Sequence, residues 1–164
     1  MEHISRSTAR LTGRHATLRS RGARELRVSD LMSPVESVVS VTASLSDAAA
    51  LVRGLDAAAL VVGLSHQPLG LITEAVLAEV ALEHPAQWEK KRCAALIGVA
   101  PGPLSPEDPI EEVLARYRIS GAQPLLVLDG DYAVGIIYPD PVFSWCLTQP
   151  SSVFDALGLG RAPH

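Results

Sequence analysis

The chain has 164 residues, of which 48% are hydrophobic and 20% charged, with a mean hydropathy of +0.22 and a formal net charge of −4. This length and composition predict a well-filled core in one ordinary domain or in two small, closely packed ones. Asp47, Arg53 and Asp56 interrupt the richest apolar stretch, so the sequence excludes an 18-residue membrane span.

Residues 1–27 form a basic leader with seven arginines and two glutamates, for a net charge of +5. The rest of the chain carries seven basic and sixteen acidic residues, for a net charge of −9. We interpret the leader as a flexible, solvated segment, because its glycines and few large apolar residues disfavour a stable helix. An arm for nucleic acid and an organelle transit peptide are less favoured alternatives. No apolar stretch follows Met1, so we expect neither a signal peptide nor export.

After the leader, the first half of the chain predicts the order strand, helix, strand, strand, helix. These elements are expected at 38–39, 46–54, 59–62, 69–73 and 74–81. Ser-Leu-Ser-Asp at 44–47 provides N-cap chemistry for the first helix, and Gly54 marks its exit. The continuous apolar run at 59–62 is typical of a strand buried on both faces.

The segment between the halves, 83–102, contains Trp88 and the basic triplet Lys90-Lys91-Arg92. We interpret it as a solvated linker; contact of the triplet with nucleic acid or a ligand phosphate is the alternative. Cys93 and Cys146 are far apart and lack companions at metal-binding spacing. They therefore indicate buried or half-buried thiols in a reducing compartment, and we expect a cytoplasmic protein.

The second half predicts the same order of elements, at 103–104, 109–118, 125–128, 133–138 and 139–145. Asp108 is the expected N-cap of its first helix, with Pro109 at the first helical position and Gly121 at the exit. Asp129-Gly130 is a hairpin signal between the two strands. Two prolines punctuate the last helix, which we expect to be shorter than its counterpart.

The two halves are one unit used twice, since 38–73 aligns with 103–138 at a constant offset and without a gap. Eight aligned positions are identical, where average residue usage predicts roughly three. In the first copy the identical residues are Ser40, Ala50, Arg53, Ala57, Leu60, Val62, Gly70 and Ile72. Neither half can bury its sheet alone, so we expect the copies to pack face to face about a pseudo-twofold axis.

The first copy resembles a cystathionine-β-synthase (CBS) domain through Val28-Ser-Asp-Leu-Met-Ser-Pro34 and Gly70-Leu-Ile-Thr73. The second copy resembles another through Leu104-Ser-Pro-Glu-Asp-Pro-Ile110 and Gly135-Ile-Ile137. The resemblance implies an α+β CBS pair, or Bateman module, standing alone over about 28–147. The expected divisions are a leader 1–27, a first repeat 28–82, a linker 83–102, a second repeat 103–147 and a tail 148–164.

The resemblance also implies a cleft between the repeats for AMP, ADP, ATP or another adenosyl compound, with no obligatory cofactor. In such domains a Gly-x-x-Thr/Ser-x-x-Asp motif holds the ribose, because a carboxylate accepts from two vicinal hydroxyls at once. Thr73 has the hydroxyl position of the first copy, but Val76 replaces the aspartate. Tyr138 replaces the threonine of the second copy, where Pro141 has the aspartate position and Asp140 lies one residue early. Any ligand is therefore expected to bind asymmetrically, on the Thr73 side.

The other candidate site residues are Val38 and Val39, which begin the first repeat, and Arg53 and Arg118, which could approach a phosphate. Each of these arginines has a favoured alternative interpretation as a solvated residue at a helix C-terminus. For Thr73, ribose binding and capping of the helix that starts at Glu74 are equally weighted. The five histidines form no cluster with metal-ligand spacing, and no nucleophile elbow or phosphate loop occurs.

These features predict a non-catalytic regulatory module that senses a small ligand, most favourably an adenosyl nucleotide, and signals to an unidentified protein. A homodimer through the amphipathic helices 46–54, 74–82 and 109–118 is expected, with no membrane association. The alternative is a ligand-free oligomerisation or interaction module, which Val76 and Pro141 favour. Nucleic-acid contact through the leader is a third, less favoured hypothesis.

Overall fold

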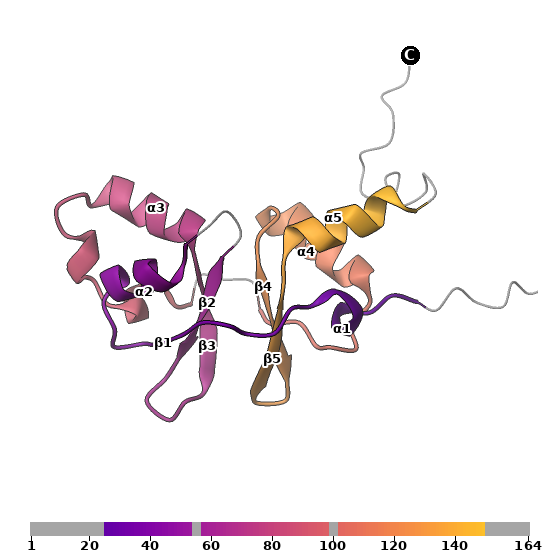
Figure 1. Ribbon diagram of the computed structural model, residues 1–164, viewed down its shortest axis with the longest axis horizontal. Coiled ribbons are helices and arrows are strands. Elements are labelled where there is room, and N and C mark those ends of the chain that lie inside the picture. The colour runs from indigo at the N-terminus through magenta and orange to yellow at the C-terminus, as the bar shows by residue number, and fades with distance from the viewer. Residues whose placement is uncertain (1–24, 54–56, 99–101, 150–164) are drawn as a thin grey trace, which may run out of the picture.

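The computed structural model describes residues 25–53, 57–98 and 102–149, and it shows two lobes side by side, each with helices along one side of a small sheet (Figure 1). The first lobe contains β1 (Val38–Ser40), α2 (Leu45–Leu51), β2 (Ala58–Val62), β3 (Pro68–Thr73) and α3 (Glu74–Glu83). The second contains α1 (Val28–Leu31), α4 (Ile110–Ser120), β4 (Leu125–Asp129), β5 (Tyr132–Ile137) and α5 (Pro139–Leu147). Two short 3-10 helices, η1 (Trp88–Lys90) and η2 (Cys93–Leu96), precede the second repeat. Within the described ranges, none of the helices has the length and apolar character needed to cross a membrane.

The first sheet has the order β1-β2-β3, with β1 parallel and β3 antiparallel to β2. The central strand β2 is buried along most of its length, which explains its unbroken apolar sequence. In the second sheet β4 pairs antiparallel with β5, and Leu104 adds a single parallel bridge to Val127 where β1 would lie. The expected α+β fold and order of elements are therefore confirmed.

Each lobe has its own hydrophobic core. Each core also includes a residue from the start of the other repeat or from the segment leading to it. Val28, which begins the first repeat in the sequence, is fully buried among Leu104, Ile110 and Val113 in the second lobe. Cys93, which the offset between the repeats makes the equivalent of Val28, is fully buried in the core of the first lobe. Both cysteines are buried and form no disulfide.

Backbone hydrogen bonds repeat this exchange at the same offset. The Val28 N–H donates to the Asp108 carbonyl at 2.9 Å, and the Cys93 N–H donates to the Ala43 carbonyl at 2.9 Å. A second pair relates the Ile110 N–H, which donates to Leu26, to the Leu45 N–H, which donates to Lys91. The same 65-residue offset therefore relates both the sequences of the two repeats and their backbone contacts, as a pseudo-twofold relationship predicts.

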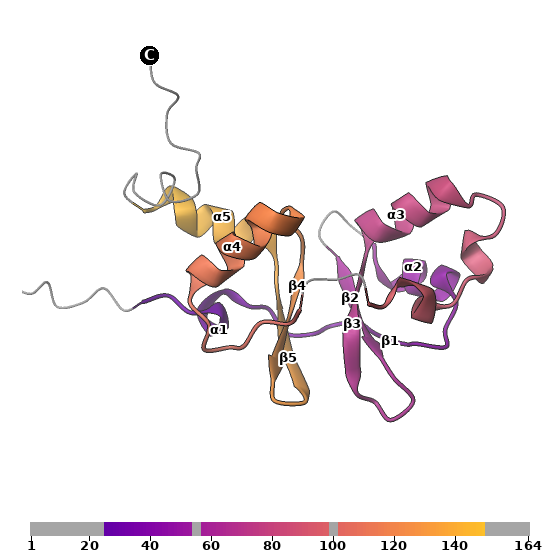
Figure 2. The same cartoon turned by 180° about the vertical axis from the view of Figure 1, so that it is seen from behind.

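Residues 32–37, which we call the strap, run from α1 in the second lobe to β1 in the first, as both views show (Figures 1 and 2). Ser33 exchanges two backbone hydrogen bonds with Ile136 of β5, each 2.8 Å long. Gly135 permits this approach, since a Cβ there would lie 2.9 Å from the Ser33 carbonyl oxygen. The strap therefore ties the two lobes together.

Local signals at the helix ends gave mixed results. Ser44 caps α2 as expected, since its hydroxyl accepts from the Asp47 N–H at 3.1 Å. The prediction for Asp108 was wrong: Pro109 is the N-cap of α4, and the Asp108 carboxylate instead accepts from the Ser105 N–H at 2.8 Å. The carboxylate closes the turn before the helix, three residues back along the chain.

The helix exits and the final helix follow the sequence more closely. Gly121 is the C-cap of α4 with a φ of 79°, a conformation that favours glycine. Gly54, its predicted counterpart, lies outside the described residues. The last helix, α5, has nine residues against ten in α3, so its two N-terminal prolines barely shorten it. Proline is compatible with the first helical turn, where N–H groups have no intrahelical acceptor.

Candidate functional site

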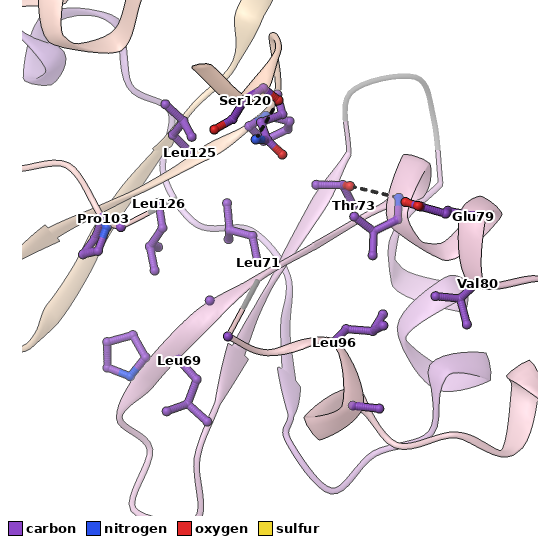
Figure 3. A pocket seen from close by; sticks show the side chains of 18 of the residues that line it. Leu69, Leu71, Thr73, Glu79, Val80, Leu96, Pro103, Ser120, Leu125 and Leu126 are labelled. Atoms are coloured by element: carbon purple, nitrogen blue, oxygen red, sulfur yellow. Dashed lines mark hydrogen bonds between the residues drawn. The ribbon is translucent and has the colours of Figure 1, made fainter. Parts of the chain in front are cut away.

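A cavity of about 600 Å³ lies between the lobes, on the Thr73 side. Its walls come from β3 and α3 of the first lobe, from η2, and from β4 and the segments before it in the second lobe (Figure 3). Most of the lining is apolar, including Leu69, Leu71, Leu96, Leu125 and Leu126. Such a concave apolar site with a few polar groups at its edge suits a small organic molecule.

Thr73 lies at the junction of β3 and α3, on the edge of this cavity. Its side-chain oxygen accepts a hydrogen bond of 3.3 Å from the Val76 N–H, so Thr73 caps α3 (Figure 3). The capping role weighed in the sequence is thus present. The hydroxyl hydrogen can still donate, and the role in ribose binding stays a prediction.

Val76 also lines the cavity, half-buried in the first turn of α3. It stands where the CBS resemblance predicts an aspartate, so this position offers a ligand apolar contact and no carboxylate. The loss of a charge-assisted hydrogen bond there is worth about 1.5–3 kcal/mol in binding.

The Tyr138 side has a smaller cavity of about 280 Å³, lined by Ser33, Pro34, Glu36, Ala57 and Tyr138. Tyr138 is the N-cap residue of α5 and its side chain makes no cap hydrogen bond. Asp140 is exposed on the first turn of α5 and does not line either of these two cavities. The two pseudo-equivalent sites therefore differ in volume as well as in sequence, and the Thr73 side is the larger.

The remaining candidates lie apart from the larger cavity. Val39 is buried in the core of the first lobe, and Val38 is half-exposed on β1. Arg53 is exposed just after α2, and Arg118 is exposed on the last turn of α4. Among the described residues that line the two cavities, none of these four occurs. Their roles in binding stay predictions.

The larger cavity is also lined by two acidic residues of α3, Glu79 and Glu83, which the sequence analysis did not select. Counted from Val76, they lie three and seven residues along the helix, so all three share one face. This helical spacing from Val76 was the signal in the sequence that could have identified the two glutamates as site residues. Ser120 and Gln123 add polar groups from the second lobe.

Basic side chains are absent from the described lining of this cavity. Arg116 borders the lining, because its guanidinium donates to the carbonyl of the lining residue Gly102. The same guanidinium bonds to Glu112 through its Nε, at 3.2 Å. The described residues also contain no cluster of histidine, cysteine, aspartate and glutamate that could hold a metal ion.

Comparisons with known proteins agree with this geometry. Residues 28–83 match the family model of the CBS domain, and no curated protein matches the sequence. Among solved structures, the CBS-domain containing protein ATU1752 from Agrobacterium tumefaciens is 17% identical with a TM-score of 0.62, covering 72% of this chain and 91% of that one. A CBS domain-containing protein from Bacillus anthracis is 21% identical with a TM-score of 0.62, covering 77% and 96%. CBSX2, whose crystal structure is in complex with AMP, is 19% identical with a TM-score of 0.57, covering 74% and 96%.

These findings confirm the resemblance seen in the sequence. The first repeat is a CBS domain, and the described chain has the fold of a CBS pair.

Proposed function

We propose that this CBS pair is a regulatory module that binds a small adenosyl ligand in the cavity beside Thr73 and transmits a conformational change to a partner. The observation that carries the proposal is the composition of the cavity walls. Thr73 and Val76 come from the first lobe, and Ser120, Gln123 and Leu126 come from the second. A ligand that contacts both lobes favours the arrangement in which both contacts are made.

The ligand class follows from the fold and from one structural relative. CBSX2 was crystallised in complex with AMP and shares this fold. A cavity of about 600 Å³ is within the range of pockets that hold small molecules. The sequence favours AMP, ADP or ATP within the adenosyl class, without an obligatory cofactor, and Thr73 supplies a hydroxyl at the position expected to meet the ribose.

A thermal-shift panel with AMP, ADP, ATP, NAD, adenosine and S-adenosylmethionine tests the proposal. A ligand at a hundred times its Kd stabilises the folded state by about 2.7 kcal/mol, which raises Tm measurably. Val76→Trp should block the cavity and abolish the shift. Leu82→Trp is the matched control, because Leu82 is 84% exposed on the same helix and does not line the cavity. An unchanged Tm with every compound at millimolar concentration would contradict ligand sensing.

The second candidate is a ligand-free interaction module, which Val76 favours because it removes the expected ribose carboxylate from the cavity. Several large apolar side chains are exposed on the helices, including Leu82, Ile119, Phe143 and Leu147. Such residues suit a homodimer formed through the helices. A defined dimer in light scattering that binds no member of the panel would favour this candidate over sensing.

The proposal concerns only the two repeats. Residues 1–24 of the arginine-rich leader and residues 150–164 of the tail lie outside the described residues. Nucleic-acid contact through the leader and a cytoplasmic location remain predictions from the sequence.

A further inference from the structure

We propose that the Thr73 cavity selects a nucleoside whose 5′ substituent is positively charged and discriminates against 5′ phosphates. This inference rests on the proposed function and refines its ligand class. It starts from Glu79 and Glu83, two carboxylates on the face of α3 that lines the cavity. A bound phosphate would add like charge beside them, whereas an ammonium group would pair with them.

The carboxylates are placed along the helix from the ribose position. Thr73 is the N-cap of α3, Val76 is one turn along it, and Glu79 and Glu83 follow on the same face. With a rise of 1.5 Å per residue, Glu79 lies about 9 Å along the axis from Thr73. That is the reach of a ribose and its 5′ substituent, so a group extending from a ribose at Thr73 along α3 meets Glu79.

Compensating positive charge is sparse around this cavity. Among the described lining residues none is lysine, arginine or histidine. The guanidinium of Arg116, which contacts the lining residue Gly102, is held by Glu112 and by the Gly102 carbonyl. The cavity therefore has a negative character that its own walls do not neutralise.

One feature favours an anion, namely the N-terminus of α3. Its Val76 N–H already donates to the Thr73 hydroxyl oxygen at 3.3 Å. Glu74 also places a carboxylate in the first turn. The Thr73 hydroxyl oxygen and the Glu74 carboxylate thus reduce the positive potential at the helix N-terminus. Glu79 and Glu83 then determine whether the cavity prefers a positively or a negatively charged ligand.

The test compares three compounds that differ only at the 5′ position: 5′-amino-5′-deoxyadenosine, adenosine and AMP. Calorimetry on the full chain at low ionic strength should give affinities in that order, with at least a tenfold difference between the first and the last. Glu79→Gln with Glu83→Gln should reduce this ratio to about threefold or less. Both side chains are exposed, so the double variant should keep the Tm of the unliganded protein.

Glu111→Gln is the control, since Glu111 is an exposed carboxylate on α4 and lies outside the cavity lining. It should leave the order and the ratio unchanged. Equal or tighter binding of AMP, or an unchanged ratio in the double variant, would overturn the charge inference and leave ligand sensing intact. Failure of all three compounds to bind would overturn the proposed adenosyl ligand itself.

Discussion

Val28 donates its backbone N–H to the carbonyl oxygen of Asp108, which belongs to the other repeat, at 2.9 Å. This bond places the start of the first repeat in the core of the second lobe, where Val28 is fully buried. The pseudo-equivalent bond from Cys93 to Ala43 places the approach to the second repeat in the core of the first lobe. The second lobe is therefore completed by the start of the first repeat, and the first lobe by the segment that leads to the second repeat. This exchange couples the stability of the two halves.

Val28→Ala should destabilise the second lobe although Val28 belongs to the first repeat in the sequence. Removing two buried methyl groups from its core should cost about 2 kcal/mol of unfolding free energy. Hydrogen exchange should show the loss of protection in α4. Val38→Ala is the control, because Val38 is 52% exposed and its loss should have little effect. A loss of protection confined to the first lobe would contradict the exchange of segments between cores.

The position of the strap predicts different effects for alanine substitution at the two equivalent glycines, Gly135 and Gly70. An alanine Cβ at Gly135 would lie 2.8 Å from the Met32 Sδ and 2.9 Å from the Ser33 carbonyl oxygen. At Gly70 the nearest atom, Ile97 Cδ1, is 3.5 Å away, which is ordinary contact. Gly135→Ala should therefore cost about 1–3 kcal/mol in urea denaturation, and Gly70→Ala should be nearly neutral. Equal changes in unfolding free energy for the two substitutions would show that the strap does not sterically restrict position 135 of β5.

Tyr117→Phe should maintain or increase stability. Within the described part of the chain, the Tyr117 hydroxyl is buried without a hydrogen-bond partner, while the ring packs against Phe143 with centroids 5.8 Å apart. Replacing the tyrosine keeps the ring contact and removes the unpaired group, a gain of up to about 1 kcal/mol at neutral pH. Urea denaturation measures the difference, and a loss of more than about 1 kcal/mol would indicate a partner for the hydroxyl.

The same variant should change the alkaline stability of the protein. Burial raises the pKa of Tyr117 above its ordinary value of 10.0. Above pH 10 the unfolded chain therefore releases the phenolic proton while the folded chain retains it, so the free energy of unfolding falls as pH rises. Phenylalanine removes this term, and the advantage of Tyr117→Phe should grow above pH 10. A constant difference between the two proteins from neutral pH to pH 11 would contradict the raised pKa.

Val76→Asp should restore the carboxylate that the CBS resemblance predicts for the ribose. Because Val76 lines the cavity one turn from Thr73, its replacement should strengthen adenosine binding by about ten- to a hundredfold in calorimetry. Leu82→Asp adds the same charge at an exposed position on α3 and should not change the affinity. If Val76→Asp also leaves it unchanged, adenosine does not place its ribose beside this turn.

The sequence predicted most of the local structure because the signals for it are local. The apolar run of β2, the Ser44 cap and the Gly121 exit each depend on residues within a few positions of one another. The prediction for Asp108 was wrong for a related reason. A carboxylate before a helix can bond forward to the first turn or back to Ser105, and the sequence does not distinguish the two directions.

By itself, the sequence determined the repeat and its constant offset, the family resemblance and the asymmetry between Thr73 and Tyr138. Only the tertiary structure decided that Val28 completes the second core, that the Thr73 side holds the larger cavity, and that Glu79 and Glu83 line it. Periodicity indicates that a helix face is apolar or polar, but it does not indicate which surface that face meets. The placement of α3 and β4 around one cavity depends on how the two lobes pack, a non-local arrangement that no short stretch of sequence encodes.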